Sequence, residues 1–235
     1  IRNYVKIYPD FLKVIKYSRP IITQKNAIPS SGCGIEEDEN TPQAQDVLQK
    51  SIARTKTTIS DYILCNDFDN FATFTFDPKI IGEKNRYNFL YCANKFSEWL
   101  RTEQQYHKRK HGSSFRYIIV PEQHKDGAWH FHAIIGGYLN NTPNFLSSSN
   151  PYSISRDRKQ NSLRSRKFIQ RYTLGRNEIQ PIKDKNRLSS YIKKYITKSL
   201  ISLPGKKRYW CSRNLRKPQI VYNALDHQYI PETPK

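Results

Sequence analysis

Two histidines one residue apart, His130 and His132, have the clearest potential for chemistry in this chain. They lie in a run of apolar and strand-forming residues from position 129 to 137. Because side chains alternate between the two faces of a strand, both imidazoles would project from one face and Phe131 from the other. Neutral imidazoles bind divalent transition metals, so the pair predicts half of a metal site.

A third metal ligand depends on the register of the hairpin that precedes these histidines. The dipeptide Asp126-Gly127 marks its turn. A two-residue turn would set Gln123 opposite His130 and direct Glu122 to the wrong face. A three-residue loop that begins at Lys125, with the glycine in the left-handed conformation, would instead set Glu122 opposite His130. We prefer this second register because it completes a ligand set; the alternative is that Glu122 is a solvated strand end.

The second register predicts one carboxylate and two imidazoles as metal ligands, namely Glu122, His130 and His132. It also sets His124 opposite Ala128, at the rim of the site, where it would support the ligands without binding the ion. Magnesium prefers shells made only of oxygen, and two imidazoles shift the preference toward manganese, although cellular abundance favours magnesium. The expected cofactor is therefore a divalent metal ion, Mn²⁺ or Mg²⁺.

A second candidate group lies in a predicted helix from Arg187 to Leu200, where a Tyr-x-x-Lys phrase occurs twice. At about 100° per residue, Tyr191 and Tyr195 lie about 40° apart on the helix surface, and a neighbouring apolar stripe would pack on a sheet. Tyrosines beside such a stripe usually belong to a core; the repeated phrase is what favours a chemical role. The lysines beside the two phenols are Lys194 and Lys198.

The charge balance points to a polyanionic partner. The chain has 40 Lys and Arg against 20 Asp and Glu, a formal net charge of +20, which suits nucleic acid. The sequence has no apolar run of about 18 residues and no signal peptide, so we expect a soluble, cytoplasmic protein that does not bind membranes. The basic and aromatic residues expected to contact DNA are Lys108, Arg109, Lys110, Arg164, Arg166, Lys167, Arg171, Lys206, Lys207, Arg208 and Trp210.

Hydrophobic periodicity predicts the elements that position these groups. The pattern indicates an α+β fold, with a central antiparallel β-sheet and helices packed on it. The four cysteines are widely spaced and are expected to be reduced and structural. The predicted order is a helix over 42–64, a strand over 71–76, a helix over 84–110 that ends at Gly112, strands over 115–122, 129–135, 167–174 and 178–182, and the helix from 187.

The chain resembles rolling-circle replication initiators (Rep proteins) of the HUH endonuclease superfamily, of the kind carried by phages and small plasmids. Residues 71–76 resemble the first family motif, with Phe74 where a leucine is usual. His130-Phe131-His132 matches the His-hydrophobic-His metal motif, and residues 191–198 match the two-tyrosine helix. The resemblance covers about residues 60–200, and the order of the motifs favours an initiator over a conjugative relaxase.

The resemblance implies a ferredoxin-like or RRM-like split βαβ fold and a metal-assisted attack by tyrosine on single-stranded origin DNA. Attack would give a 5′-phosphotyrosine and a free 3′-hydroxyl, with later rejoining of strands. Tyr191 and Tyr195 would be the nucleophiles, and Lys194 or Lys198 would neutralise charge or assist proton transfer. A host polymerase and helicase are the implied partners, in the host cytoplasm if the gene is phage-borne.

The motifs also suggest a division of the chain into four parts. These are an N-terminal arm or linker over 1–41, a leading helix over 42–66, the HUH endonuclease domain over 67–203 and a basic C-terminal extension over 204–235. The chain contains no methionine, so we expect it to be a piece of a longer product.

Two other functions share parts of this pattern. A single-strand DNA transposase or relaxase of the same superfamily would share the histidines, but such transposases normally use one tyrosine. A non-catalytic RRM-like nucleic-acid-binding protein would also be basic and aromatic, yet it would have no reason to group Glu122 with His130 and His132. Metal binding separates this last hypothesis from the enzymatic ones.

Overall fold

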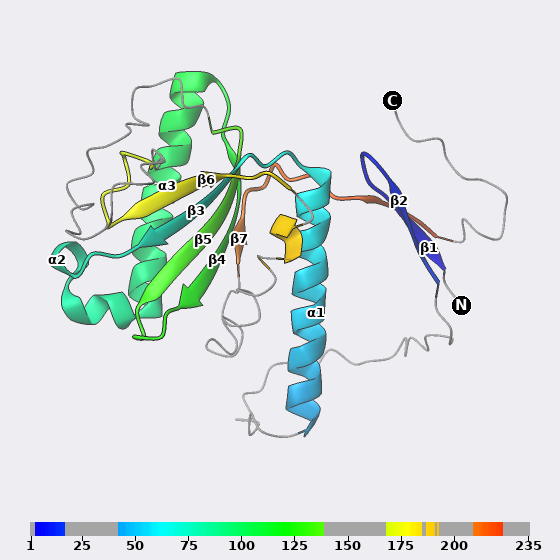
Figure 1. Cartoon of the computed structure of the whole chain (residues 1–235), viewed down its shortest axis with the longest axis horizontal. Helices are drawn as coiled ribbons and strands as arrows, with labels where there is room; N and C mark the ends of the chain where they lie inside the picture. Colours follow the sequence, from blue (N-terminus) through cyan, green and yellow to red (C-terminus); the bar gives the residue numbers. More distant parts are fainter. Residues whose placement is uncertain are drawn as a thin grey trace, which may run out of the picture. The chain divides into compact units, whose positions relative to one another are not determined.

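The computed structural model describes residues 3–16, 42–138, 168–184, 187–190, 192 and 209–222 (Figure 1). The chain divides into two compact units. One comprises Ile1–Cys65 with Arg216–Lys235, and the other comprises Asn66–Leu215. No helix in the described ranges is long and apolar enough to cross a membrane.

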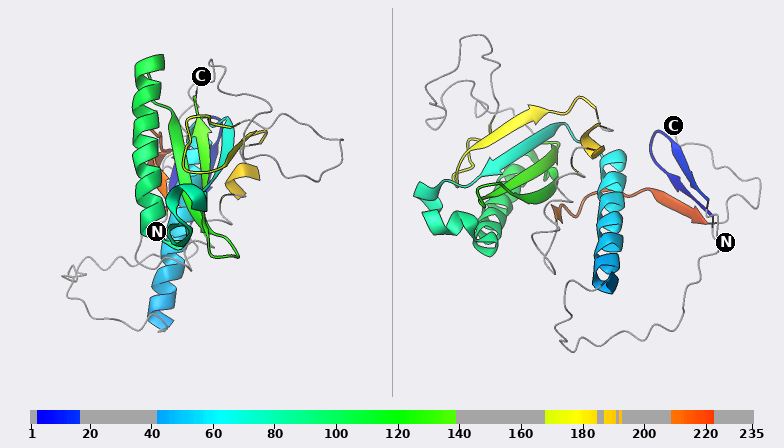
Figure 2. Two further views of the ribbon diagram at one scale, coloured as in Figure 1. Left: turned by 90° about the vertical axis from the view of Figure 1, so that its left-hand side faces the viewer. Right: turned by 60° about the horizontal axis from the view of Figure 1, so that its bottom comes forward.

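The larger unit is built on a five-stranded sheet whose order is β6-β3-β5-β4-β7. Every neighbouring pair in it is antiparallel. The helix α3 runs along one face of this sheet (Figure 2), which confirms the expected α+β fold. The elements are β3 (Asn70–Thr75), α2 (Pro78–Ile81), the 3-10 helix η1 (Glu83–Tyr87), α3 (Phe89–His111), β4 (Arg116–Gln123), β5 (Trp129–Gly136), β6 (Asn177–Pro181) and β7 (Trp210–Cys211).

Aromatic side chains fill the space between this sheet and α3. Phe74 of β3 meets Phe96 of α3 with ring centroids 5.1 Å apart, and Phe131 of β5 meets the same ring at 4.9 Å. These edge-on contacts are the favoured geometry for aromatic pairs. Because side chains alternate along β5, packing Phe131 against α3 directs His130 and His132 to the opposite face of the sheet.

The ends of α3 follow from two local signals. The side chain of Asn88 accepts a hydrogen bond from the N–H of Tyr91, which caps the first turn. Gly112 ends the helix in the left-handed conformation, with φ 75°, as its sequence position predicts. The predicted single helix over 84–110 is wrong at its start, because Asn88 interrupts it and residues 83–87 form η1 instead.

The segment 168–174, predicted as a strand, is a turn and loop. The buried side chain of Asn177 donates to the carbonyl of Ile169 and accepts from its N–H, so side-chain bonds replace a strand ladder. Gly175 follows, close to β3: a Cβ there would lie 2.3 Å from the carbonyl oxygen of Thr75. The second predicted strand, over 178–182, is confirmed as β6.

The smaller unit contains the long helix α1 (Pro42–Cys65) and a three-stranded antiparallel sheet. The helix confirms the prediction over 42–64, whereas no strand was expected in the first 41 residues. Lys6 and Tyr8 both bind Asp61 of α1, at 2.5 and 2.6 Å, which ties the first strand to the helix. The strands are β1 (Tyr4–Ile7), β2 (Leu12–Ile15) and β8 (Gln219–Tyr222), in the order β2-β1-β8.

Candidate active site

The hairpin between β4 and β5 has the register that brings the predicted ligands together. Glu122 pairs with His130 across the two strands. At the tip, the N–H of His124 donates to the carbonyl of Ala128 at 2.8 Å, and Gly127 takes a φ of 86°. This is the three-residue loop with a left-handed glycine, so the second register is confirmed.

Glu122 and His132 are in direct contact on the histidine face of the sheet. Nε2 of His132 lies 2.7 Å from Oε2 of Glu122, and both side chains are largely shielded from solvent. Phe71 of β3 lies parallel to the His132 ring, with centroids 5.7 Å apart. The imidazole is therefore held at an apolar wall and at a carboxylate.

The other ring nitrogen of His132 has its own partner, Thr73 of β3. Thr73 pairs with His132 across the sheet, and its Oγ1 lies 3.2 Å from Nδ1. A hydroxyl can either donate or accept, so Thr73 accommodates either neutral tautomer of the ring. A metal ion bound through Nε2 would require the proton on Nδ1, where Thr73 supplies the acceptor.

His130 is partly buried beside a third histidine. Its ring is nearly parallel to that of His124, with centroids 4.9 Å apart and an interplanar angle of 15°. Burial lowers the pKa of His130, and the neighbouring His124 and His132 lower it further, against a smaller opposing effect of Asp126 and Glu122. His130 is thus neutral near pH 7, the form that binds metals.

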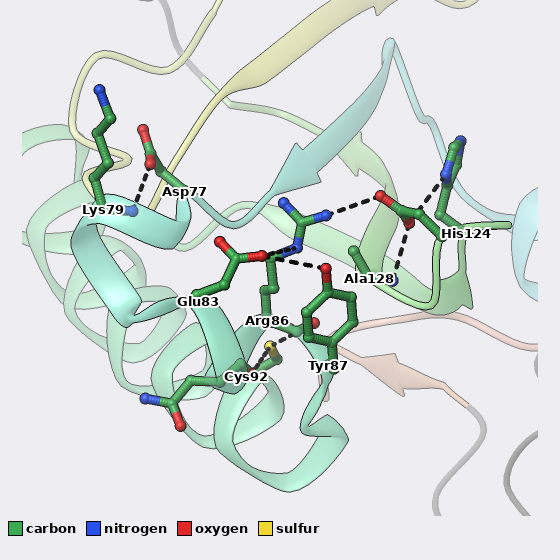
Figure 3. A network of polar contacts seen from close by, with 10 residues as sticks. Asp77, Lys79, Glu83, Arg86, Tyr87, Cys92, His124 and Ala128 are labelled. Carbon is green, nitrogen blue, oxygen red and sulfur yellow. Dashed lines mark hydrogen bonds and ion pairs between the residues drawn. The ribbon is translucent and has the colours of Figure 1, made fainter.

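The tip of this hairpin is fixed to η1 by charged and polar contacts (Figure 3). Asp126 accepts from the N–H of Ala128 at 3.0 Å and lies 3.2 Å from Nδ1 of His124. Its other oxygen binds Arg86 of η1 at 2.9 Å. The hydrogen bond from Ala128 is the main cause of a lowered Asp126 pKa, with smaller contributions from His124 and Arg86.

The donor types on this face suit a divalent metal ion, because one carboxylate and two imidazoles form a familiar set for manganese, iron or zinc. The set is not gathered around one point, however. Among the residues that the structure describes, no group of three or more His, Cys, Asp and Glu side chains is arranged to hold a metal. The side chains that do touch are Glu122 and His132, with His130 beside them in the strand register.

The predicted nucleophilic helix is described only in part. Residues 187–190 and 192 are helical, and Leu188 and Ile192 are buried. These residues lie across the sheet from α3, on the histidine side (Figure 2). The four residues with predicted chemical roles, Tyr191, Lys194, Tyr195 and Lys198, fall outside the described residues.

Two of the predicted DNA-binding residues are engaged elsewhere in the structure. Nε of Arg171 donates to the buried carboxylate of Glu103 at 2.8 Å, and its guanidinium lies 3.8 Å from the ring centroid of Tyr106. Trp210 packs on Phe131, with ring centroids 5.5 Å apart, in the core beneath α3. Both side chains thus have a packing role that their sequence context does not reveal.

The remaining DNA-binding candidates divide into two groups. Lys108, Arg109 and Lys110 are exposed in the last turn of α3, where positive charge also suits the helix dipole. The others lie outside the described residues and comprise Arg164, Arg166, Lys167, Lys206, Lys207 and Arg208.

Sequence reasoning missed several residues that support the site. Thr73 and Phe71 contact His132, and Arg86 fixes the loop that carries His124. Thr73 could have been found only by knowing that β3 pairs with β5 in this register. Arg86 offered no local signal, because its partner Asp126 lies 40 residues away.

Comparison with known families gives one match. The family model described as replication-associated protein ORF2 matches residues 69–200, more than half of the chain. No curated protein and no solved structure matches the chain. The matched segment contains β3 through β6 and the helical residues that follow, so it includes every residue of the site described above.

Proposed function

Because the chain belongs to the replication-associated protein ORF2 family, we propose that it is a replication initiator that nicks single-stranded origin DNA. A tyrosine hydroxyl, from Tyr191 or Tyr195, attacks the scissile phosphorus. The bond from phosphorus to the 3′ oxygen of the preceding nucleotide breaks while a bond to the tyrosyl oxygen forms. The products are a 5′-phosphotyrosine and a 3′-hydroxyl, and the phenol proton moves to the departing oxygen through solvent or a lysine.

The pairing of Glu122 with His132, backed by Thr73, is the observation that supports this proposal. An imidazole held between a carboxylate and a hydroxyl is a typical arrangement for a metal ligand. Glu122, His130 and His132 would hold a divalent ion, Mn²⁺ or Mg²⁺. The ion would polarise the phosphate and stabilise the charge that develops on it.

The residues of this chain have distinct roles in the proposed reaction. Thr73 fixes the orientation of His132, and His124 restricts the ring of His130 by stacking on it. Lys194 and Lys198 would neutralise charge on the phosphate. The second tyrosine would accept a second strand end without release of the first, and a host polymerase would extend the free 3′-hydroxyl.

A labelled single-stranded origin library, incubated with the protein and Mn²⁺ and run on denaturing gels, tests the proposal. We expect a covalent adduct that maps by mass spectrometry to Tyr191 or Tyr195. The adduct should disappear in the double variant Tyr191→Phe/Tyr195→Phe, in His130→Ala, in His132→Ala, and in excess chelator.

His111→Ala is the matched control, since it removes an imidazole from the end of α3 and should leave the adduct intact. An adduct on another residue, or nicking by the double tyrosine variant, would contradict the assignment. DNA binding without any adduct would instead favour the non-catalytic hypothesis.

A further inference from the structure

An aromatic residue of η1, Tyr87, is exposed next to the hairpin that carries the histidines. Its side chain is 41% exposed, although an aromatic ring of this size usually buries most of its surface. Figure 3 shows Tyr87 and His124 at the same hairpin tip. An exposed aromatic ring beside a proposed phosphate-cleaving site requires an explanation in terms of a partner.

The Tyr87 ring is held in place although it is exposed. Its hydroxyl donates to Oε1 of Glu83 at 3.2 Å, and its carbonyl accepts from the indole N–H of Trp129 at 3.2 Å. The guanidinium of Arg86 lies 4.9 Å from the ring centroid. The turn passes close by, since a Cβ on Gly127 would lie 3.4 Å from a ring carbon. A ring fixed in this way loses little conformational entropy when a partner binds.

The same contacts connect Tyr87 to the histidine face. Arg86 lies over Tyr87 and also binds Asp126, which in turn lies within hydrogen-bond distance of the His124 ring. His124 is exposed and stacks on His130. Flat rings therefore follow one another from η1 across the hairpin tip to the predicted metal ligands.

Positive charge surrounds these rings. Lys84 of η1 and Lys125 of the hairpin tip are both exposed. The two nearby carboxylates, Glu83 and Asp126, are occupied by Arg86. Flat rings combined with cations are the features that bind single-stranded nucleic acid, in which unpaired bases stack and phosphates are neutralised.

We propose that the surface formed by Tyr87, Lys84, His124 and Lys125 binds the single-stranded DNA that flanks the scissile phosphate. Tyr87 stacks on a base, the two lysines contact phosphates, and Arg86 positions the ring. A single strand is the committed partner because a base within a duplex presents no free face to a side chain. The inference rests on the proposed function, for which it names the position of the flanking strand.

Binding of a fluorescein-labelled single strand of random sequence, about 20 nucleotides long, tests this surface by anisotropy. The measurement is made in excess chelator, so that the strand stays uncleaved. Tyr87→Ala should weaken binding by about 5- to 100-fold, because one base–aromatic stack is lost, and Tyr87→Phe should bind like the wild type. The slope of log affinity against log salt should stay unchanged in both variants, since neither removes a charge.

Lys84→Gln and Lys125→Gln should behave differently, each making the slope shallower by about 0.7. Tyr222→Ala is the matched control, because Tyr222 is also exposed but lies on β8 of the other unit. Equal affinity of Tyr87→Ala and wild type, or an equal loss in Tyr222→Ala, would overturn the inference. If the wild type itself does not bind the strand, the proposed function fails rather than this surface.

Discussion

Thr73 shows how a single hydroxyl can determine what an imidazole does. Thr73→Val keeps the shape and the β-branched backbone preference while removing the partner of His132 Nδ1. We expect at least a tenfold loss of Mn²⁺ affinity, because partners of ligating histidines typically contribute 10- to 100-fold. Isothermal titration with Mn²⁺ measures the effect.

Thr75→Val is the control for this prediction. Thr75 lies two residues further along the same strand face, but its hydroxyl donates to the carbonyl of Arg176 instead of a histidine. Its Mn²⁺ affinity should stay close to that of the wild type. An equal loss in both valine variants would mean that strand stability, rather than the hydroxyl on His132, sets the affinity.

The buried cysteines give a second prediction for single residues. Burial raises the pKa of Cys65 to about 11 and that of Cys92 to about 12. Because the thiolate is the reactive form, both should resist maleimide at pH 8 in the folded protein and react after denaturation. Mass spectrometry of the labelled protein locates the modified residues. Rapid labelling of Cys92 without denaturant would contradict its position in the core.

Among the elements, α3 is tied to two separate segments by one carboxylate. Glu103, 1% exposed, accepts from the hydroxyl of Tyr138 at 2.7 Å and from Arg171 at 2.8 Å. Burial and the adjacent Glu103 carboxylate together raise the pKa of Tyr138 well above its ordinary value. One side chain therefore anchors the end of β5 and the loop before β6 to the same helix.

We predict that Glu103→Ala lowers the free energy of unfolding by about 3 kcal/mol, because it leaves Arg171 and the Tyr138 hydroxyl without their buried acceptor. Urea unfolding followed by circular dichroism gives the value. Glu98→Gln is the control: Glu98 pairs with Lys95 at the exposed surface of the same helix, where such a pair contributes less than about 1 kcal/mol. Similar losses in the two variants would contradict the special role of Glu103.

Local chemistry explains which elements the sequence could predict. The register of Glu122 and His130 followed from the Asp-Gly turn, since a few adjacent residues determine it. The loop over 168–174 was mistaken for a strand because its apolar residues pack under α3, while Asn177 replaces the ladder. Thr73 was missed because it lies 59 residues from His132, a pairing that no local pattern encodes.

At the scale of the whole molecule, the excess of positive charge predicts salt-dependent binding. If the protein neutralises about six phosphates, log affinity for a single strand should fall against log salt with a slope of about −4. Fluorescence anisotropy over a range of salt concentrations measures this slope. A slope near zero would show that the basic residues do not face the nucleic acid.

The pairing of β1 with β8 has a consequence for the order in which the protein can mature on the ribosome. Tyr4 pairs with Tyr222, and Val5 with Val221, so the central strand of this sheet meets one of its two neighbours only after almost all of the described chain has been synthesised. Until then β1 has only β2, and a lone hairpin is marginally stable in water. The smaller unit must therefore finish folding after translation of β8, whereas the paired strands of the larger unit are complete earlier, at residue 211.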